Sequence, residues 1–232
     1  MSDPNAPQGP DAAPDALPDA APEALPTALA HVTRLVSALQ SEGRAPAFEV
    51  LKWPDPRLSK PCKEAELTAG ARAPDGVVAL ALGILHTMYA ASGRGLAAPQ
   101  IGVLTRLFVM DVTWKEGAQN PCVCLNPEIL DAAPETSVME EGCLSIPGVL
   151  APVTRPDEIT LAYTDLDGVR VVRRLSGMEA RCAQHEIDHL DGLVTFDRLQ
   201  ADRRAKLEAV YAVSNTPALA APTPQFLPRS EE

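Results

Sequence analysis

Prolines recur every three or four residues at the start of the chain, at positions 4, 7, 10, 14, 18, 22 and 26. Because proline lacks a backbone N–H and fixes φ, this spacing excludes both helices and sheet ladders. A second Pro-rich stretch closes the chain. We therefore expect a disordered acidic tail over 1–46 with a short helix at 28–40, one globular domain over 47–214, and a second tail over 215–232.

Net charge limits the partners of this domain. The formal net charge of -11 repels phosphates, which argues against broad binding to nucleic acid or to anionic lipid. No positively charged leader and no apolar run of about 18 residues is present, so neither export nor a membrane span is predicted. Five widely spaced cysteines, an odd number, favour reduced thiols. These features predict a cytoplasmic protein.

The middle of the chain alternates between helical and extended patterns. Helical spacing of apolar residues occurs at 76–91, 177–190 and 201–214, and β-rich runs occur at 104–112, 123–129, 159–163 and 169–175. The last two runs flank a turn-forming segment and predict a hairpin. We expect an α+β fold in which antiparallel strands pack around a central helix, with additional N-terminal and C-terminal helices.

The expected central helix contains the segment His185-Glu186-Ile187-Asp188-His189. Residues at i and i+4 share a helix face, so His185 and His189 can offer two imidazoles to one ion. Glu186 points about 100° round the helix and can reach a water at that ion. The pattern predicts a metal-binding helix of a hydrolase, against the simpler interpretation of a surface helix with scattered histidines.

A catalytic metal site usually has three protein ligands, so the third ligand separates the classes of metalloenzyme. One class places a histidine six residues after the second, but residue 195 is threonine. Another class uses a glutamate about twenty residues on, and Glu208 stands near that position. Arg204, one turn earlier, favours a surface salt bridge for Glu208. Cys143, a thiol on a short loop between turn-forming residues, is the stronger candidate.

Three segments, 93–100 (GRGLAAPQ), 141–145 (EGCLS) and 184–189 (QHEIDH), resemble in this order the signature motifs of peptide deformylases. The resemblance extends from about residue 50 to 199. It implies a metal-dependent hydrolase that removes the N-formyl group from the N-terminal methionine of newly made proteins and releases formate. Two alternatives stay open: a metallopeptidase that shares only the two-histidine helix, and a weakly active deformylase-like paralogue.

The resemblance also assigns the metal site. Cys143, His185 and His189 would hold one divalent ion, and Glu186 would take a proton from the attacking water and deliver it to the leaving amine. One thiolate and two imidazoles would ordinarily suggest zinc. The family resemblance instead implies Fe2+, with Zn2+, Ni2+ or Co2+ able to occupy the same site.

Further residues are assigned to the substrate by the same resemblance. The Gln100 side-chain amide and the Leu144 backbone N–H would stabilise the oxyanion, and Gly95 would admit the peptide backbone because it has no Cβ. Arg94 departs from the family pattern, which usually has an aliphatic residue there, close to where the methionine side chain should bind. We therefore assign Arg94 to substrate binding and expect it to influence side-chain preference.

Supporting contacts are suggested as well. Glu141 and Arg155 resemble a charged pair that steadies the Cys143 segment, with a plain surface pair as the competing interpretation. The partners implied are formyl-methionyl nascent peptides, with no direct nucleic-acid or membrane binding. Local positive charge also suggests a ribosome-contacting patch formed by Arg198, Arg203, Arg204 and Lys206.

Overall fold

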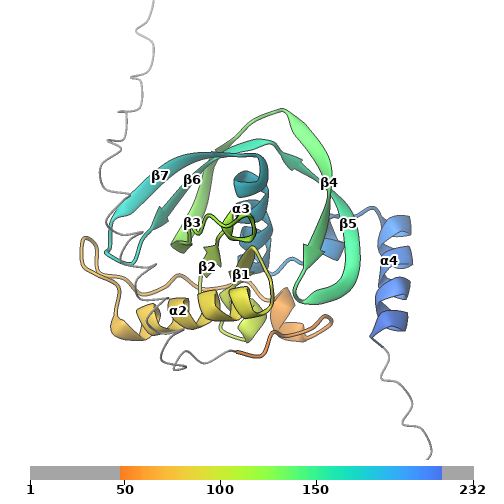
Figure 1. The fold of residues 1–232 in the computed structure, drawn as a ribbon, viewed down its shortest axis with the longest axis horizontal. Helices are drawn as coiled ribbons and strands as arrows, with labels where there is room; N and C mark the ends of the chain where they lie inside the picture. The colour runs from red at the N-terminus through yellow and green to blue at the C-terminus, as the bar shows by residue number, and fades with distance from the viewer. Residues whose placement is uncertain (1–47, 216–232) are drawn as a thin grey trace, which may run out of the picture.

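The structure is a computed structural model that describes residues 48–215 (Figure 1). Seven strands and three α-helices form this part of the chain. The helices are α2 (Asp75–Ala90), α3 (Gly177–Leu190) and α4 (Ala201–Ser214). The strands are β1 (Gly95–Ala97), β2 (Leu107–Met110), β3 (Cys122–Ala132), β4 (Thr136–Cys143), β5 (Ile146–Pro156), β6 (Glu158–Thr164) and β7 (Arg170–Ser176). Four short 3-10 helices connect them: η1 (Pro56–Ser59), η2 (Ala98–Ile101), η3 (Trp114–Glu116) and η4 (Thr195–Arg198).

The strands form two separate antiparallel sheets. Five of them pair in the order β1-β2-β3-β6-β7, and β4 pairs with β5 in a two-stranded ribbon. Helix α3 contacts β1, β2, β6 and β7 of the larger sheet and also β5 of the ribbon. It therefore lies between the two sheets, near the middle of the domain (Figure 1).

The larger sheet is covered by a helix on each face, and strand β2 shows why. Its four residues, LFVM, are all buried. Leu107 and Val109 join the apolar cluster around α2, whereas Phe108 and Met110 join the cluster around α3. Because side chains alternate between the faces of a strand, a continuous apolar run is expected where both faces are covered. Helix α3 therefore packs on one face of the larger sheet, and α2 packs on the other.

Helix α3 ends at a sharp turn. Gly192 adopts a positive φ of 78°, and its N–H donates to the carbonyl of His189 at 3.2 Å, while Leu193 N–H donates to the Asp188 carbonyl at 2.8 Å. A Cβ at residue 192 would lie 2.9 Å from the backbone of Lys60, so the turn needs glycine. The chain then enters η4 and α4, and α4 packs against β5.

Most of the predicted elements are confirmed, including the α+β class, the three helices and the β6–β7 hairpin. The strand predicted at 104–112 is shorter, spanning Leu107–Met110, and the one at 123–129 is longer, spanning Cys122–Ala132. The prediction that Cys143 lies on a loop was wrong, because Cys143 is the last residue of strand β4. All five cysteines are free, as expected.

Two other expectations concern the ends of the chain and the membrane. The predicted tails, with the helix at 28–40, lie outside the described residues, apart from residue 215, so the predicted domain limits stay a prediction. Over residues 48–215, no helix is both long enough and apolar enough to cross a membrane.

Candidate metal centre

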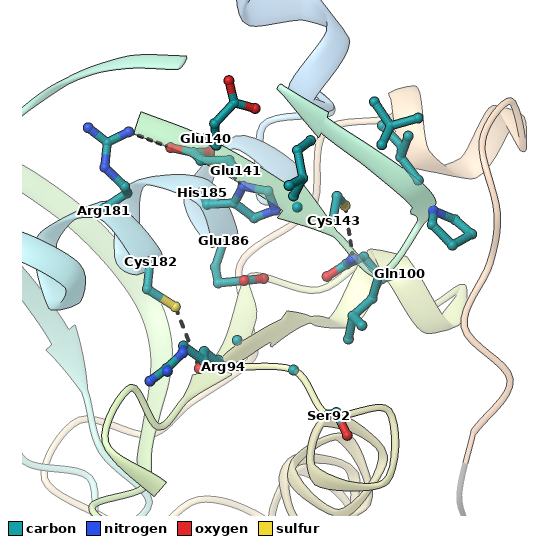
Figure 2. A pocket seen from close by; sticks show the side chains of 18 of the residues that line it. Ser92, Arg94, Gln100, Glu140, Glu141, Cys143, Arg181, Cys182, His185 and Glu186 are labelled. Atoms are coloured by element: carbon teal, nitrogen blue, oxygen red, sulfur yellow. Dashed lines mark hydrogen bonds and ion pairs between the residues drawn. The ribbon is translucent and has the colours of Figure 1, made fainter. Parts of the chain in front are cut away.

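Strand β4 and helix α3 bring three metal-ligating side chains together. The ligand atoms of Cys143, His185 and His189 all lie within 4.8 Å of one another. The Sγ of Cys143 is 3.3 Å from Nε2 of His189, and the two imidazole rings are 5.1 Å apart between centroids. The histidines stand one helical turn apart on α3, and Figure 2 shows the His185 ring pointing toward Cys143 at the end of β4. This is the geometry that the i, i+4 spacing predicts.

These three side chains fit a single ion. Imidazole nitrogen and thiolate sulfur bind zinc-like ions at about 2.0–2.3 Å, so donor atoms within 4.8 Å of one another can share one centre. Glu208 does not belong to this group, since its carboxylate accepts a hydrogen bond from Arg204 Nε at 2.7 Å. The salt-bridge interpretation of Glu208 is therefore confirmed.

The protonation of the cysteine favours a ligand role. Burial alone would raise the pKa of the Cys143 thiol, but the adjacent His189 and His185 imidazoles hold that pKa well below its ordinary value. The thiolate is the form of cysteine that binds metals. Cys143 is therefore poised as an anionic ligand.

Glu141 orients one of the two imidazoles. Its Oε2 lies 3.0 Å from Nδ1 of His185, while its two oxygens accept from Arg155 at 2.6 and 2.9 Å and from Arg181 at 2.7 Å. Burial opposes ionisation of this carboxyl, but the bonds from His185 and Arg155 lower its pKa to about 2. The Glu141–Arg155 pair is buried, with side chains 6% and 4% exposed, so the surface-pair interpretation was wrong.

Glu186 differs from Glu141 in its surroundings. It is 3% exposed, and its Oε2 has no hydrogen-bond partner within the described part of the chain. Burial raises the pKa of Glu186 to about 7, although the neighbouring His185 and His189 act in the opposite direction. A buried carboxyl with a free oxygen and a pKa near neutrality can both accept and return a proton.

Cys143 and His185 of this centre line a cleft of about 600 Å3, which Figure 2 shows from close by. Gln100, Leu144 and Gly95, which the sequence assigns to the oxyanion and the substrate, all line it, and these roles stay predictions. The Gln100 amide is fixed, because its Oε1 accepts from Ala97 N–H at 2.9 Å while its Nε2 donates to Ser145 Oγ at 3.1 Å. The same Nε2 lies 3.7 Å from Cys143 Sγ, so the amide donor faces the centre.

Gly95 lies close to side chains of helix α3. A Cβ at this position would lie 2.3 Å from Glu186 Oε1 and 2.8 Å from Cys182 Sγ. Any larger residue would displace Glu186 or the backbone of β1. Gly95 therefore keeps open the space between the β1 backbone and α3.

Arg94 also lines the cleft, but its guanidinium is used elsewhere. It pairs with Glu116 at 2.7 Å and contacts the Val112 carbonyl, while the Arg94 carbonyl accepts from Asp111 N–H at 2.8 Å. Figure 2 shows the Arg94 side chain below Cys182, on the side away from Cys143. These contacts attach η3 to the rim of the cleft.

Sequence reasoning missed Arg181 and Asp188 as supports of the centre. Arg181 donates to Glu141, and the Asp188 carboxylate pairs with Arg155 Nη1 at 3.0 Å. Both are buried on α3. A signal was present, since positions 181, 185 and 188 share one helix face, and charged residues on the same face as a metal ligand suggest buried ion pairs.

Comparisons with known proteins agree with one another. A family model described as polypeptide deformylase matches residues 47–205. A peptide deformylase from Prochlorococcus marinus subsp. pastoris is 39% identical over 165 residues, covering 71% of this chain and 80% of the relative. One from Picosynechococcus sp. is 47% identical over 130 residues, covering 56% of this chain and 70% of the relative.

Solved structures give the same result. The crystal structure of a peptide deformylase from Ehrlichia chaffeensis matches with a TM-score of 0.66 and 33% identity, covering 75% of this chain and 100% of that chain. The corresponding structure from Synechococcus elongatus, in complex with actinonin, matches with a TM-score of 0.65 and 34% identity, covering 72% of this chain and 87% of that chain.

Proposed function

The chain belongs to the peptide deformylase family and is a hydrolase that removes the formyl group from N-terminal formyl-methionine, and we propose which of its residues carry out this reaction. In this proposal Cys143, His185 and His189 bind one divalent ion, and Glu186 transfers protons. The observation that carries it is the convergence of one thiolate and two imidazoles beside a buried carboxyl whose pKa is about 7.

Each side chain has a separate task. When bound, a divalent ion acts as a Lewis acid on the formyl carbonyl and acidifies water. Glu186 accepts the proton that the attacking water loses and returns it to the leaving amine nitrogen, so that formate and a free N-terminus result. Gln100 Nε2 and the Leu144 backbone N–H donate to the oxyanion, and donors fixed in advance are effective there.

Formate release from a formyl-Met peptide tests the proposed mechanism. Glu186→Ala should keep its metal, because no proposed ligand is lost, and should be slower by roughly 10²–10⁴-fold, the usual contribution of a general acid–base. Glu140→Ala, which removes a neighbouring carboxylate that also lines the cleft, is the matched control. Equal rates for wild type and Glu186→Ala, with metal content unchanged, would refute the role of Glu186.

The ion itself is proposed to be Fe2+, with Zn2+, Ni2+ and Co2+ able to replace it. Family membership supports iron, while the donor set alone would also suit zinc. Anaerobic purification followed by elemental analysis and activity per metal ion tests this proposal. Zinc as the sole and most active occupant would contradict it.

The two-histidine metallopeptidase alternative is not favoured, since the family match and the ion pair of Glu208 both argue against it. The rate of turnover of formyl-Met peptides distinguishes a weakly active paralogue from a fully active deformylase. A metal-loaded enzyme that turns over formyl-Met peptides at only a trace rate would favour the paralogue.

We further propose that the protein acts in the cytoplasm on nascent chains at the ribosome. Arg203 and Lys206 are exposed on α4, whereas Arg204 pairs with Asp197 and Glu208 and Arg198 pairs with Asp188, so the patch is narrower than its sequence suggests. Loss of ribosome co-sedimentation on neutralising Arg203 and Lys206 is expected. Unchanged co-sedimentation would refute the proposal that this patch contacts the ribosome. Recovery of the protein with membranes would contradict the proposed cytoplasmic location.

A further inference from the structure

We propose that Arg198, at the protein surface, is a positioning residue for the metal centre. It forms the outer end of a chain of alternating charges whose inner end is the Nδ1 atom of His185. This inference rests on the proposed role of His185 as a metal ligand. It assigns to Arg198 a different task from the ribosome contact that its sequence context suggests.

The chain can be followed atom by atom. Arg198 Nε donates to Asp188 Oδ2 at 3.0 Å, and its Nη2 contacts Asp188 Oδ1. Arg155 Nη1 lies 3.0 Å from the same Asp188 Oδ2. The other donors of Arg155, Nε and Nη2, bond to Glu141 at 2.6 and 2.9 Å. Glu141 Oε2 then lies 3.0 Å from His185 Nδ1.

The inner members of this chain are removed from water. The side chains of Asp188, Arg155 and Glu141 are 7%, 4% and 6% exposed, whereas that of Arg198 is 44% exposed. Buried charges are tolerated when each has partners of opposite sign in good geometry. Arg198 is the point at which this buried series meets solvent.

Removing Arg198 changes how Arg155 is shared between its two carboxylate partners, Asp188 and Glu141. Asp188 is shared by two arginines, and without Arg198 it would depend on Arg155 alone. Arg155 would then be drawn from Glu141 toward Asp188, because both buried carboxylates share its guanidinium, and Glu141 would depend more on its other arginine, Arg181. The position of Glu141, and through it the ring orientation of His185, would be less well fixed.

The chain also connects four elements. Arg198 is the last residue of η4, Asp188 is on α3, Arg155 is on β5 and Glu141 is on β4. It therefore joins the segment that follows the catalytic helix to both strands of the ribbon that carries Cys143. Through these contacts Arg198, a surface residue, is connected to α3, which carries His185, and to the ribbon, which carries Cys143.

Metal release from the full-length, cobalt-loaded enzyme tests the proposal. Loss of Co2+ to excess EDTA can be followed by visible absorption, which also reports the ligand geometry. Arg198→Met keeps the aliphatic stem and removes every donor, and it should release cobalt roughly three- to tenfold faster, below the 10–100-fold typical of losing a direct partner of a metal ligand. Its kcat should fall severalfold while KM for a formyl-Met peptide stays unchanged.

Arg204→Met is the matched control. Arg204 lies on the same surface and pairs with Asp197 of η4, but it makes no contact with Asp188 in the structure described for residues 48–215. We expect wild-type cobalt release from this variant. Equal release from Arg198→Met and Arg204→Met, whether fast or slow, would overturn the proposal, since the effect would then be absent or would reflect the attachment of η4 in general.

Two further variants keep the test decisive. Arg198→Lys retains the charge but not the planar fork, and should release cobalt at an intermediate rate; a rate equal to wild type would show that the fork is not needed, contrary to the proposal. This variant decides the matter if Arg198→Met does not fold. Cys143→Ser reports separately on the ligands: cobalt binding as tight as in wild type would refute the proposed metal site, whatever Arg198 does.

Discussion

The carboxylate of Glu141 lies 3.0 Å from Nδ1 of His185, and this contact determines which ring nitrogen remains for an ion. In the neutral imidazole that binds metals, an Nδ1–H that donates to a carboxylate leaves Nε2 unprotonated and fixes the plane of the ring. The bonds from His185 and Arg155 keep Glu141 ionised, and Arg155 and Arg181 hold it in place. The orientation of His185 is therefore set by charges on three elements, β4, β5 and α3.

Replacing Glu141 by glutamine should weaken metal binding. Glu141→Gln removes the negative charge that offsets two buried arginines and leaves only one acceptor oxygen for four donor atoms, two from Arg155 and one each from Arg181 and His185. We expect metal affinity to fall roughly 10–100-fold, together with a lower melting temperature. Chelator competition measures the affinity, and Glu140→Gln, at the exposed neighbouring position, is the control. Equal affinities for the two variants would contradict this role.

A methyl group at Gly95 should block the reaction while leaving the fold intact. The Cβ of Gly95→Ala would fall 2.3 Å from Glu186 Oε1, so the catalytic carboxylate must move. A misplacement of about 1 Å can lower turnover by about 10²-fold. Gly76→Ala on α2, where a Cβ meets nothing within 4 Å, is the control and should keep full activity. Wild-type kcat in Gly95→Ala would show that this space is not needed.

Stability of the metal-free protein should depend on pH through Glu186. The pKa of this carboxyl is about 7 in the folded state and near the ordinary 4.5 when unfolded, so the folded state binds more protons between these values. Stability contributed by this group is therefore lost as pH rises from 4.5 to 7.

The variant Glu186→Gln isolates this effect. Its unfolding free energy relative to wild type should increase with pH, by about 3 kcal/mol between pH 4.5 and pH 8. Urea unfolding at several pH values measures the difference, and Glu140→Gln controls for the loss of a surface charge. A difference that does not change with pH would contradict a raised pKa.

Arg94→Ile should restore the aliphatic residue usual in the family, and, contrary to the expectation from the sequence, it should have little effect on side-chain preference. The Arg94 guanidinium is already paired with Glu116, which is 60% exposed, and a solvent-exposed ion pair contributes at most about 1 kcal/mol. We expect kcat/KM for formyl-Met and formyl-Leu peptides to change by less than about fivefold, with their ratio preserved. A reversal of the ratio of the two kcat/KM values would show that Arg94 contacts the first side chain of the substrate directly.

The arrangement of His185, Glu186 and His189 on helix α3 was predictable because its information is local. The two histidines and Glu186 fall within five residues, and the 3.6-residue period places them without knowledge of any other element. The β6–β7 hairpin was predictable for the same reason, since its strands are consecutive and join through a short turn.

The β4–β5 ribbon was not predicted, because its strands contain residues that usually interrupt sheets. Pro147, Pro152 and Gly148 all lie in β5. A two-stranded ribbon has free edges that tolerate proline, and Pro152 sits opposite Glu140 without breaking the pairing. Alternating burial of Val149, Ala151 and Val153 is the signal that could have identified it.

Ion pairs between residues that are distant in the sequence could be predicted only in part. Glu141 and Arg181 are 40 residues apart, and Arg155 and Asp188 lie on different elements, so only the tertiary fold determines which charges meet. The family resemblance suggested the Glu141–Arg155 pair but not its connections to Asp188 and Arg198. Local spacing carries no information about such pairings.

Cys143 and the two histidines come from separate parts of the fold, one from the ribbon and two from the helix beneath it. An ion bound by all three would be a cross-link between the β4–β5 ribbon and helix α3. Occupancy and folding would then be linked equilibria, with the folded state gaining RT ln(1 + [M]/Kd) of stability from the free ion. Removal of the ion would loosen the same ribbon that forms one wall of the cleft, so an unloaded enzyme would lose the shape of its binding site together with its reactivity.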